Sequence, residues 1–272
     1  MEVTTFTLRL IDILILGVVQ GITEWLPVSS SGHLAIIQNY LGLSREEHLL
    51  IFIDIMLHVG TLAVILIEFR EDIAKIVKAT VRLDFKTEEG KLALFILVGS
   101  VPTALISFTL RSIFESFFEK LLVVGIALLV TGFFLFASER RKDNKELDYL
   151  DSLLIGIAQG IAFIPGISRS GVTIATGLLR KVKKEAAFRY SFLLSIPAVI
   201  GTAVASTIAE FGSLSTQDIY LPTVLFGVIT SMILGYVSFK LLQRMVMKGR
   251  FHMFAYYCWI VGAIIIFYHL FQ

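Results

Sequence analysis

Charged residues are scarce in this chain: only 17% of its 272 residues are Asp, Glu, Lys or Arg, whereas 56% are hydrophobic. A single soluble domain of this length cannot bury so much apolar surface, so the composition predicts a polytopic membrane protein. Cysteine is nearly absent as well. With Cys258 alone, the chain can form neither an intramolecular disulfide nor a cysteine metal site. The net charge is only +2, and we expect no nucleic-acid partner.

Long apolar runs dominate the chain instead. A helix needs about 20 apolar residues to cross a bilayer. Six stretches qualify: 49–69, 92–110, 121–138, 187–209, 220–243 and 252–271. Two further stretches, 10–42 and 152–180, are long enough but are interrupted by Pro, Gly, Ser and charged residues. Irregular backbone at membrane depth is tolerated only where protein buries it or a wet cavity surrounds it, so we predict two broken, re-entrant hairpins.

The two interrupted stretches resemble each other. Residues 17–36 (GVVQGITEWLPVSSSGHLAI) align without a gap on residues 156–175 (GIAQGIAFIPGISRSGVTIA), with seven identities in twenty positions. We therefore predict an all-α membrane protein of one domain, residues 1–272, built from two repeats of about 8–138 and 150–271. Each repeat is expected to contain one hairpin followed by three transmembrane helices.

The distribution of basic residues predicts how the hairpins enter the membrane. If both return to the side from which they enter, nineteen Lys and Arg residues lie on one face and four on the other. If each crossed once, the split would be eleven to twelve. Because cytoplasmic loops are rich in Lys and Arg, the count favours re-entrant hairpins in a cell membrane, with both termini external.

Three spans separate the hairpins, so the second is expected to enter from the opposite face to the first. The repeats are then inverted, and the tips of the hairpins meet near the midplane. Secondary transporters commonly have this architecture. A polyprenyl-phosphate transporter or flippase is therefore the alternative to any enzymatic function that the site chemistry indicates.

The first hairpin carries hydrogen-bonding groups inside an apolar run. Glu24 is an ionisable residue at membrane depth, which is costly unless it is paired, hydrated or bound to a cation. Gln20 lies one turn earlier on the same helix face. The stretch PVSSSGH follows and contains Ser29, Ser30, Ser31 and His33. Hydroxyls and backbone amides at the start of a helix make a good anion site.

The second hairpin contains a fixed positive charge. The stretch PGISRSGVT places Arg169 between Ser168 and Ser170, with Thr173 one turn further on. A guanidinium binds phosphate oxygens in a bidentate manner and stays charged in a dry site. A simpler role for Arg169 is a salt bridge to Glu24 that braces the hairpins. Arg169 can both bind phosphate and form this salt bridge, since the salt bridge can form while no substrate is bound.

Together these residues suit the hydrolysis of a phosphoanhydride. Ser30 can attack phosphorus, Glu24 or His33 can move the proton, and Arg169 can stabilise the charge that develops on the phosphoryl oxygens. Alternatively, Glu24 helps to hold a divalent cation that activates water. The residues themselves leave the choice between a serine nucleophile and an activated water open.

A further ionisable pair lies inside the first full span. Asp54 and His58 are four residues apart and share a helix face. Ionisable residues at membrane depth indicate function by default. The pair is expected either to support Glu24 or His33 from behind, or to pair with itself and fix helix packing.

These motifs resemble the undecaprenyl-diphosphate phosphatase family, also called the bacitracin-resistance proteins. The resemblance rests on GVVQGITEWLPVSSSGHL, PGISRSGVT and YSFLLSIPAVIG, and it extends over essentially the whole chain. It implies a membrane enzyme that removes the terminal phosphate of undecaprenyl diphosphate and so recycles the lipid carrier for cell-wall synthesis. Bacitracin is involved indirectly, because it competes for the same lipid.

The resemblance also assigns residues. The catalytic ones are expected to be Glu24, Ser30, His33 and Arg169. The substrate-binding ones are expected to be Gln20, Ser29, Ser31, Ser168, Ser170 and Thr173. The resemblance implies a site that opens to the external face and a divalent cation, Mg2+ or Ca2+, with Glu24 as its ligand; Gln20 leaves one carboxylate fewer for such a site. The lipid chain length and the choice between a monomer and a homodimer stay open.

Overall fold

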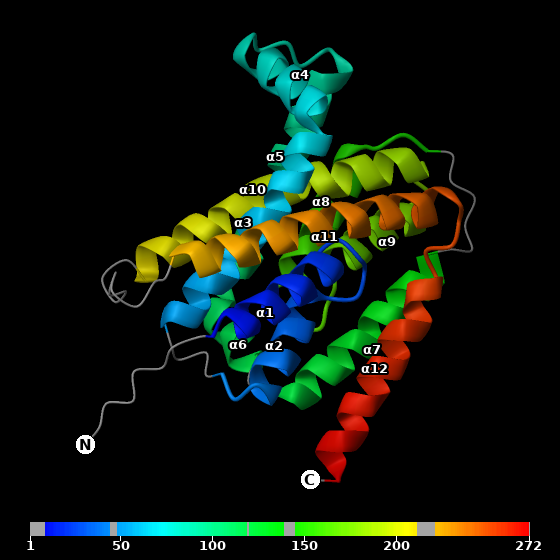
Figure 1. Cartoon of the computed structure of the whole chain (residues 1–272). Coiled ribbons are helices and arrows are strands. Elements are labelled where there is room, and N and C mark those ends of the chain that lie inside the picture. Colours follow the sequence, from blue (N-terminus) through cyan, green and yellow to red (C-terminus); the bar gives the residue numbers. More distant parts are fainter. Residues whose placement is uncertain (1–8, 44–47, 119, 139–144, 211–220, 272) are drawn as a thin grey trace.

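The computed structural model describes residues 9–43, 48–118, 120–138, 145–210 and 221–271. Within these ranges the chain forms twelve helices and no strand, which confirms the predicted all-α class (Figure 1). They are α1 (Leu10–Thr23), α2 (Ser30–Tyr40), α3 (His48–Glu68), α4 (Arg70–Val81), α5 (Glu88–Thr109), α6 (Arg111–Phe117), α7 (Leu121–Ser138), α8 (Tyr149–Ile161), α9 (Arg169–Leu179), α10 (Lys184–Glu210), α11 (Leu221–Met247) and α12 (Met253–Leu270).

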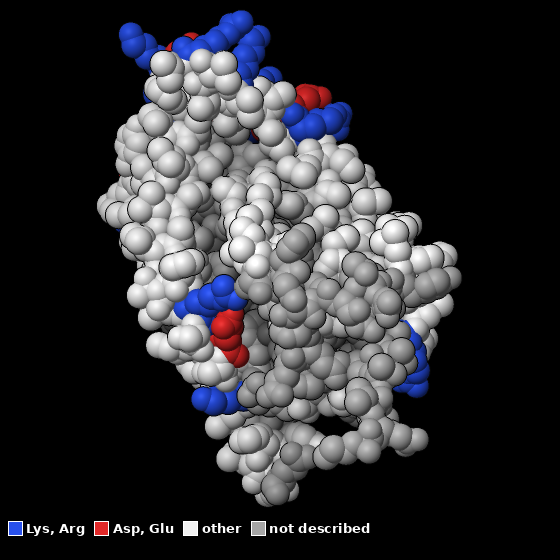
Figure 2. Space-filling model, turned by 90° about the vertical axis from the view of Figure 1, so that its left-hand side faces the viewer, with Lys and Arg blue, Asp and Glu red and all other residues white. Residues whose placement is uncertain are grey.

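Six of the described helices are long and apolar enough to cross a membrane: α3, α5, α7, α10, α11 and α12. They coincide with the six predicted stretches, which confirms the predicted spans. Large apolar side chains such as Phe108, Phe133 and Ile264 are exposed on their surfaces, as expected for helices that face lipid. Lys and Arg gather at the end of the molecule where α4 lies, whereas uncharged side chains cover most of the described part of this face (Figure 2).

The two interrupted stretches each form two helices joined by a turn. In the first, α1 ends at Thr23, and the turn contains Pro27, which lacks the N–H that a continuing helix requires. Ser29 then caps α2, because its hydroxyl accepts a hydrogen bond from the backbone N–H of Gly32 at 3.2 Å. In the second, Ser168 caps α9 in the same way.

Each of these helical hairpins packs against a helix from the other half of the chain. α1 packs on α11, and α8 packs on α5. Glycines form both contacts: a Cβ on Gly17 would lie 2.8 Å from the carbonyl oxygen of Gly227, and a Cβ on Gly156 would collide with the backbone of Gly99. Small residues of this kind allow close helix packing within a membrane. α7 and α12 lie side by side (Figure 1).

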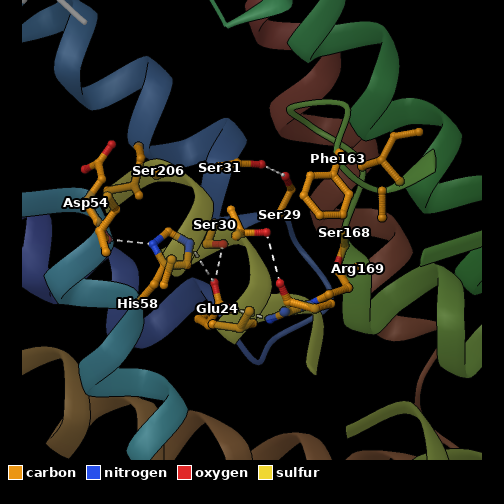
Figure 3. A pocket seen from close by; sticks show the side chains of 18 of the residues that line it. Glu24, Ser29, Ser30, Ser31, Asp54, His58, Phe163, Ser168, Arg169 and Ser206 are labelled. Carbon is orange, nitrogen blue, oxygen red and sulfur yellow. Dashed lines mark hydrogen bonds and ion pairs between the residues drawn. The ribbon is translucent and has the colours of Figure 1, made fainter. Parts of the chain in front are cut away.

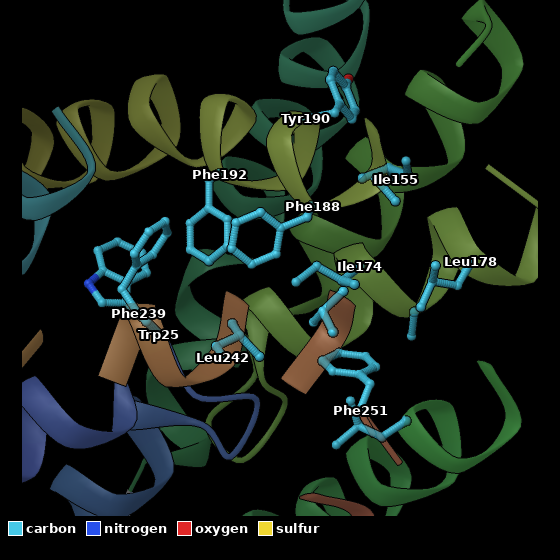
Figure 4. Close-up of a cluster of buried hydrophobic side chains, with 14 of the residues drawn as sticks. Trp25, Ile155, Ile174, Leu178, Phe188, Tyr190, Phe192, Phe239, Leu242 and Phe251 are labelled. Carbon is cyan, nitrogen blue, oxygen red and sulfur yellow. The ribbon is translucent and has the colours of Figure 1, made fainter. Parts of the chain in front are cut away.

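An aromatic cluster fixes the first turn on the spans behind it. Trp25, which follows α1, is 1% exposed, and its ring lies edge-on to Phe192 of α10 with centroids 5.4 Å apart (Figure 4). Phe192 in turn contacts Phe188 at 4.6 Å and Phe239 of α11 at 5.0 Å. Aromatic pairs in this geometry add to the apolar area that they bury. The backbone next to Glu24 is therefore held by the core.

Candidate active site

A cavity of about 250 Å3 lies where the two turns meet (Figure 3). The first hairpin contributes Glu24, Ser29, Ser30 and Ser31, the second contributes Gln159, Phe163, Ser168 and Arg169, and α3 contributes Asp54 and His58. Side chains that are more than a hundred positions apart in the sequence thus face one space. The fold brings together the polar groups that the sequence distributes over two stretches.

Glu24 is the centre of the hydrogen-bond network at this cavity, although its residue is only 7% exposed. The Ser30 hydroxyl donates to Glu24 Oε2 at 2.6 Å, and Gln20 Nε2 donates to the same oxygen at 3.0 Å. Arg169 forms an ion pair with Oε1. A buried carboxylate is costly without such partners, so the predicted salt bridge between the hairpins compensates for the burial of Glu24.

Arg169 is held between Glu24 and the first turn. Its guanidinium carbon lies 5.5 Å from the centroid of the Trp25 ring, within the range of a cation–π interaction. Its side chain is 20% exposed and lines the cavity. Because a guanidinium has five N–H donors, Arg169 can hold Glu24 and still donate to a phosphate group.

Ser29 connects the two turns directly. Its hydroxyl oxygen accepts a hydrogen bond from the backbone N–H of Gly166 at 3.0 Å, in addition to the one from Gly32. Its φ is +69°, in the left-handed region that residues other than glycine rarely adopt. Such a backbone conformation persists only where the surroundings hold it. The bond to Gly166 is one such constraint, and it joins the hairpins at the cavity.

Two helices begin at the cavity. α2 begins at Ser30, and α9 begins at Arg169, and each helix has eleven residues. The first turn of a helix presents unpaired N–H groups and a partial positive charge. Two such ends beside a guanidinium favour an anion in the cavity. The arrangement is therefore suited to a phosphate group.

The two predicted site histidines lie in different places. His58 Nδ1 donates to the backbone oxygen of Asp54 at 2.7 Å, and His58 Nε2 faces Glu24 Oε2 at 3.6 Å (Figure 3). His33 is outside the described lining of the cavity. Its Nδ1 donates to the backbone oxygen of Ser29 at 2.8 Å, and its Nε2 bonds the Tyr257 hydroxyl of α12 at 2.8 Å. The imidazole beside Glu24 is that of His58.

Among the remaining predicted residues, Ser31, Ser168 and Asp54 line the cavity together with Ser29, whereas Gln20, Ser170 and Thr173 are outside its lining. Gln20 Nε2 donates to Glu24 and to the Thr61 hydroxyl, and the Asp54 carboxylate accepts from Gln38. The hydroxyls of Ser170 and Thr173 donate to the backbone oxygens of Trp25 and Arg169, respectively. These hydrogen bonds shape the walls of the cavity from behind.

Three further residues at the site were not predicted from the sequence. Thr131 of α7 accepts a hydrogen bond from the Ser168 backbone N–H at 3.1 Å and donates to the Gly166 carbonyl at 3.0 Å. Gln159 lines the cavity. The sequence contained a signal for Gln159, because it is the counterpart of Gln20 in the aligned repeats. Tyr257, which bonds His33, has no comparable signal.

The side chains around Glu24 do not form a complete metal site by themselves. Within the described residues, no group of three or more His, Cys, Asp or Glu side chains could hold a metal ion. Both oxygens of Glu24 already interact with Arg169, Ser30 or Gln20. Position 20 supplies an amide rather than a carboxylate, so the site lacks the second acidic ligand of a two-carboxylate metal site.

Comparison with known proteins agrees with the resemblance seen in the motifs. Residues 13–264 match the model of the family described as bacitracin resistance protein BacA. A protein of Halothermothrix orenii named undecaprenyl-diphosphatase is 40% identical over 95% of this chain and 98% of its own length. Proteins of the same name from Korarchaeum cryptofilum and Methanosphaera stadtmanae are 41% and 42% identical, over 93% and 95% of this chain and 97% and 98% of their own lengths.

Proposed function

Because the chain belongs to the bacitracin resistance protein BacA family, we propose that it hydrolyses undecaprenyl diphosphate to undecaprenyl phosphate and inorganic phosphate. It is a multi-pass membrane enzyme of the phosphatase class. The relatives are named as diphosphatases, which favours hydrolysis over the alternative of lipid transport. The observation that carries the proposal is the 2.6 Å hydrogen bond from the Ser30 hydroxyl to Glu24, at a cavity that also contains Arg169.

The geometry supports Ser30 as the nucleophile. Its oxygen forms a bond to the terminal phosphorus while its proton passes to Glu24 Oε2, and the bond from that phosphorus to the bridging oxygen breaks. Undecaprenyl phosphate leaves with the electron pair of that bond. Arg169 and the N–H groups that begin α2 and α9 stabilise the charge on the phosphoryl oxygens.

The second half of the reaction reverses the proton transfer. Glu24 first passes the proton that it took from Ser30 to His58 Nε2, which faces Glu24 Oε2 at 3.6 Å, and from there to solvent. Water then attacks the phosphoserine while Glu24 takes a proton from it. The bond from phosphorus to the Ser30 oxygen breaks, Glu24 returns the proton to that oxygen, and inorganic phosphate leaves. The four side chains used in this cycle all line the cavity: Glu24, Ser30, His58 and Arg169.

The membrane arrangement is part of the proposal. We infer one domain of two inverted repeats, about 8–138 and 150–271, with re-entrant hairpins and a site open to the external face of the plasma membrane. The reciprocal packing of α1 on α11 and of α8 on α5 supports the repeats. The gathering of Lys and Arg beside α4 supports a cytoplasmic position for that end. An externally open site would consume the lipid for which bacitracin competes.

Phosphate release from undecaprenyl diphosphate by the purified protein tests the function. We expect Ser30→Ala and Glu24→Gln each to lower kcat by about a hundredfold to ten thousandfold. Ser116→Ala, which removes a hydroxyl from exposed α6, should keep full activity. Absence of phosphate release by the wild type would exclude the function, whereas full activity of Ser30→Ala would exclude the serine nucleophile. Transfer of labelled polyprenyl phosphate across proteoliposomes without phosphate release would instead favour transport.

A further inference from the structure

The helix α4 projects beyond the membrane helices at the end of the molecule where α3 ends and α5 begins (Figure 1). None of its twelve residues is buried. Its inner face packs on the core of the protein through Ile73 and Ile76. Its outer face is exposed and contains both apolar and basic side chains. Helices with these two kinds of side chain are typical of segments that lie at the surface of a membrane.

The apolar part of the outer face is a short row of side chains, Val77, Val81 and Leu83. Val77 and Val81 are one helical turn apart and are 54% and 79% exposed, and Leu83, just after the helix, is 74% exposed. The neighbouring spans end at Glu68 and begin at Glu88. The apolar row therefore lies outside the segments that cross the membrane, although contact with water is unfavourable for such side chains.

Leu83 also has an unfavourable backbone conformation, because its φ of +54° lies in the left-handed region that favours glycine. It ends α4 in a Schellman motif, in which the N–H of Leu83 donates to the Thr80 oxygen at 3.0 Å and the N–H of Asp84 donates to the Ala79 oxygen at 2.9 Å. A glycine at this position would form the same hydrogen bonds without strain.

Three other helices end in the same motif and allow a comparison. The residue in the left-handed conformation is Gly42 after α2 and Gly249 after α11. After α9 it is Lys181, whose exposed side chain is charged and suits water. Among the described residues, Leu83 is the one apolar side chain at such a position, and it is exposed. Packing within the described chain therefore does not account for a leucine there.

The basic side chains of the outer face have no acidic partner. Lys75, Lys78 and Arg82 are exposed, and none of them forms an ion pair with another described residue. The acidic residues of α4 lie in its first turn, where Asp72 pairs with Arg189 of α10. Unpaired cations beside apolar side chains fit the phosphate groups of anionic lipids. Their long aliphatic stems allow the charges to reach the headgroups while the apolar row is inserted.

We propose that the outer face of α4 binds the surface of an anionic bilayer. The apolar row inserts between the acyl chains beneath the headgroups, and the three basic residues contact lipid phosphates. Lys and Arg gather at this end of the molecule (Figure 2), so in the proposed topology the bilayer surface is that of the cytoplasmic leaflet. This face takes no part in the proposed reaction, so the inference does not depend on the function.

A fluorophore in the apolar row tests this surface. It is attached to Val81→Cys in protein that is reconstituted into nanodiscs of phosphatidylcholine with or without phosphatidylglycerol; the native Cys258 is buried. Brominated lipid quenches a fluorophore that is inserted in the bilayer, whereas acrylamide quenches one that is in water. We expect quenching by brominated lipid in the presence of phosphatidylglycerol and several-fold weaker quenching in its absence.

Two variants separate the charges from the apolar contact. Replacement of the three basic residues of α4 by Gln should lower quenching by brominated lipid to the level seen without phosphatidylglycerol. Leu83→Gly should also lower it, while its unfolding temperature should be no lower than that of the wild type, because glycine suits the backbone there. A matched control replaces by Gln three exposed basic residues at the end of α11 and should leave the quenching unchanged: Arg244, Lys248 and Arg250.

The contrary outcomes are distinct. Quenching of the fluorophore by acrylamide alone, with phosphatidylglycerol present, would overturn the proposal, because the outer face would then lie in water and be left to a soluble partner. Equal quenching by brominated lipid with and without phosphatidylglycerol would overturn the recognition of anionic lipid. Unchanged quenching in Leu83→Gly would overturn the insertion of Leu83.

Discussion

The reactivity that we assign to Ser30 depends on how the partners of Glu24 divide its two oxygens. Oε1 pairs with Arg169, whereas Oε2 accepts from Ser30 and faces His58. The oxygen that takes the serine proton is therefore not the one that holds the guanidinium. A buried carboxylate with this division can act as a base while its charge stays compensated.

His33 is expected to act by positioning rather than by proton transfer. Its ring joins the carbonyl of Ser29, at the start of α2, to Tyr257 of α12. We predict that Tyr257→Phe and His33→Ala each lower kcat because the turn that carries Ser30 loses an anchor. The double variant should lose no more than His33→Ala alone, since both substitutions break one link. A loss in the double variant equal to the product of the two single losses would show that His33 has a separate role.

Cation dependence can be tested at the same residues. We propose that Mg2+ or Ca2+ reaches the site bound to the diphosphate of the substrate, since the side chains around Glu24 do not form a metal cage. Titration of Mg2+ into the substrate-free protein should therefore show no saturable site by calorimetry. A chelator should still abolish phosphate release, and added Mg2+ should restore it. Stoichiometric binding to the substrate-free protein that Glu24→Gln removes would contradict this expectation.

At the scale of elements, the second hairpin is held at both ends. At its tip, Thr131 of α7 binds the turn before α9. At its base, the Asp151 carboxylate of α8 accepts hydrogen bonds from Lys145 Nζ and Arg180 Nε, each at 2.8 Å. Asp151 is 0% exposed, so these contacts compensate for its burial. The contacts at the tip and at the base therefore oppose movement of the hairpin that contains Arg169.

The start of α8 gives this hairpin a dependence on pH. Asp148 caps α8 by accepting from the backbone N–H of Asp151 at 2.8 Å, and Lys145 pairs with it at 2.7 Å. The Lys145 ammonium, helped by that backbone hydrogen bond, lowers the pKa of the Asp148 carboxyl from 3.8 to about 2. Because the pKa is lower in the folded state, the stabilisation is fully present above pH 3.8 and is lost as the pH falls towards 2.

Two substitutions separate the cap from the charge. Asp148→Ala should lower the stability of the protein by about 1 kcal/mol at neutral pH, as is usual for the loss of an N-cap. Asp148→Asn keeps an acceptor for the Asp151 N–H, so it should lose less and should lack the acid-dependent part of the change. Thermal unfolding in detergent at neutral pH and near pH 3 measures both effects. The same acid-dependent decrease in Asp148→Asn as in the wild type would assign that decrease to other groups.

At the scale of the whole molecule, neither hairpin contains a complete site. The first supplies Glu24 and Ser30, and the second supplies Arg169, so catalysis requires the two halves of the chain to be packed together. All of these residues belong to one chain. The hydrogen bond from the Gly166 backbone N–H to the Ser29 hydroxyl and the packing of α1 and α8 on helices of the opposite half maintain that arrangement.

The orientation of the whole molecule can be tested with a matched pair of substitutions. Lys78 of α4 and Lys120 before α7 are both exposed, and the proposed topology places them on the cytoplasmic and external sides. In intact cells, a membrane-impermeant maleimide should label Lys120→Cys and should leave Lys78→Cys unlabelled until the cells are opened. The native Cys258 is buried, so the background is low. The reverse labelling pattern would invert the topology and place the site on the cytoplasmic side.

The helical class, the six spans, the two interrupted stretches and the motif residues could all be predicted from the sequence. These features are local: a span is a continuous apolar run, and the repeat is visible as identities at a fixed offset. Glu24, Ser30 and Arg169 could be predicted to lie at one site because each is a polar residue that an apolar run would otherwise exclude.

Which motif residues face the cavity became clear only from the packing of the helices. His33 and Thr173 belong to the same motifs as Ser30 and Arg169. His33 nevertheless bonds the Tyr257 hydroxyl, and Thr173 donates to the backbone oxygen of Arg169. The imidazole beside Glu24 belongs instead to His58. The direction of a side chain depends on the backbone angles of the turn and on helices that are distant in the sequence. A local sequence pattern predicts neither of these.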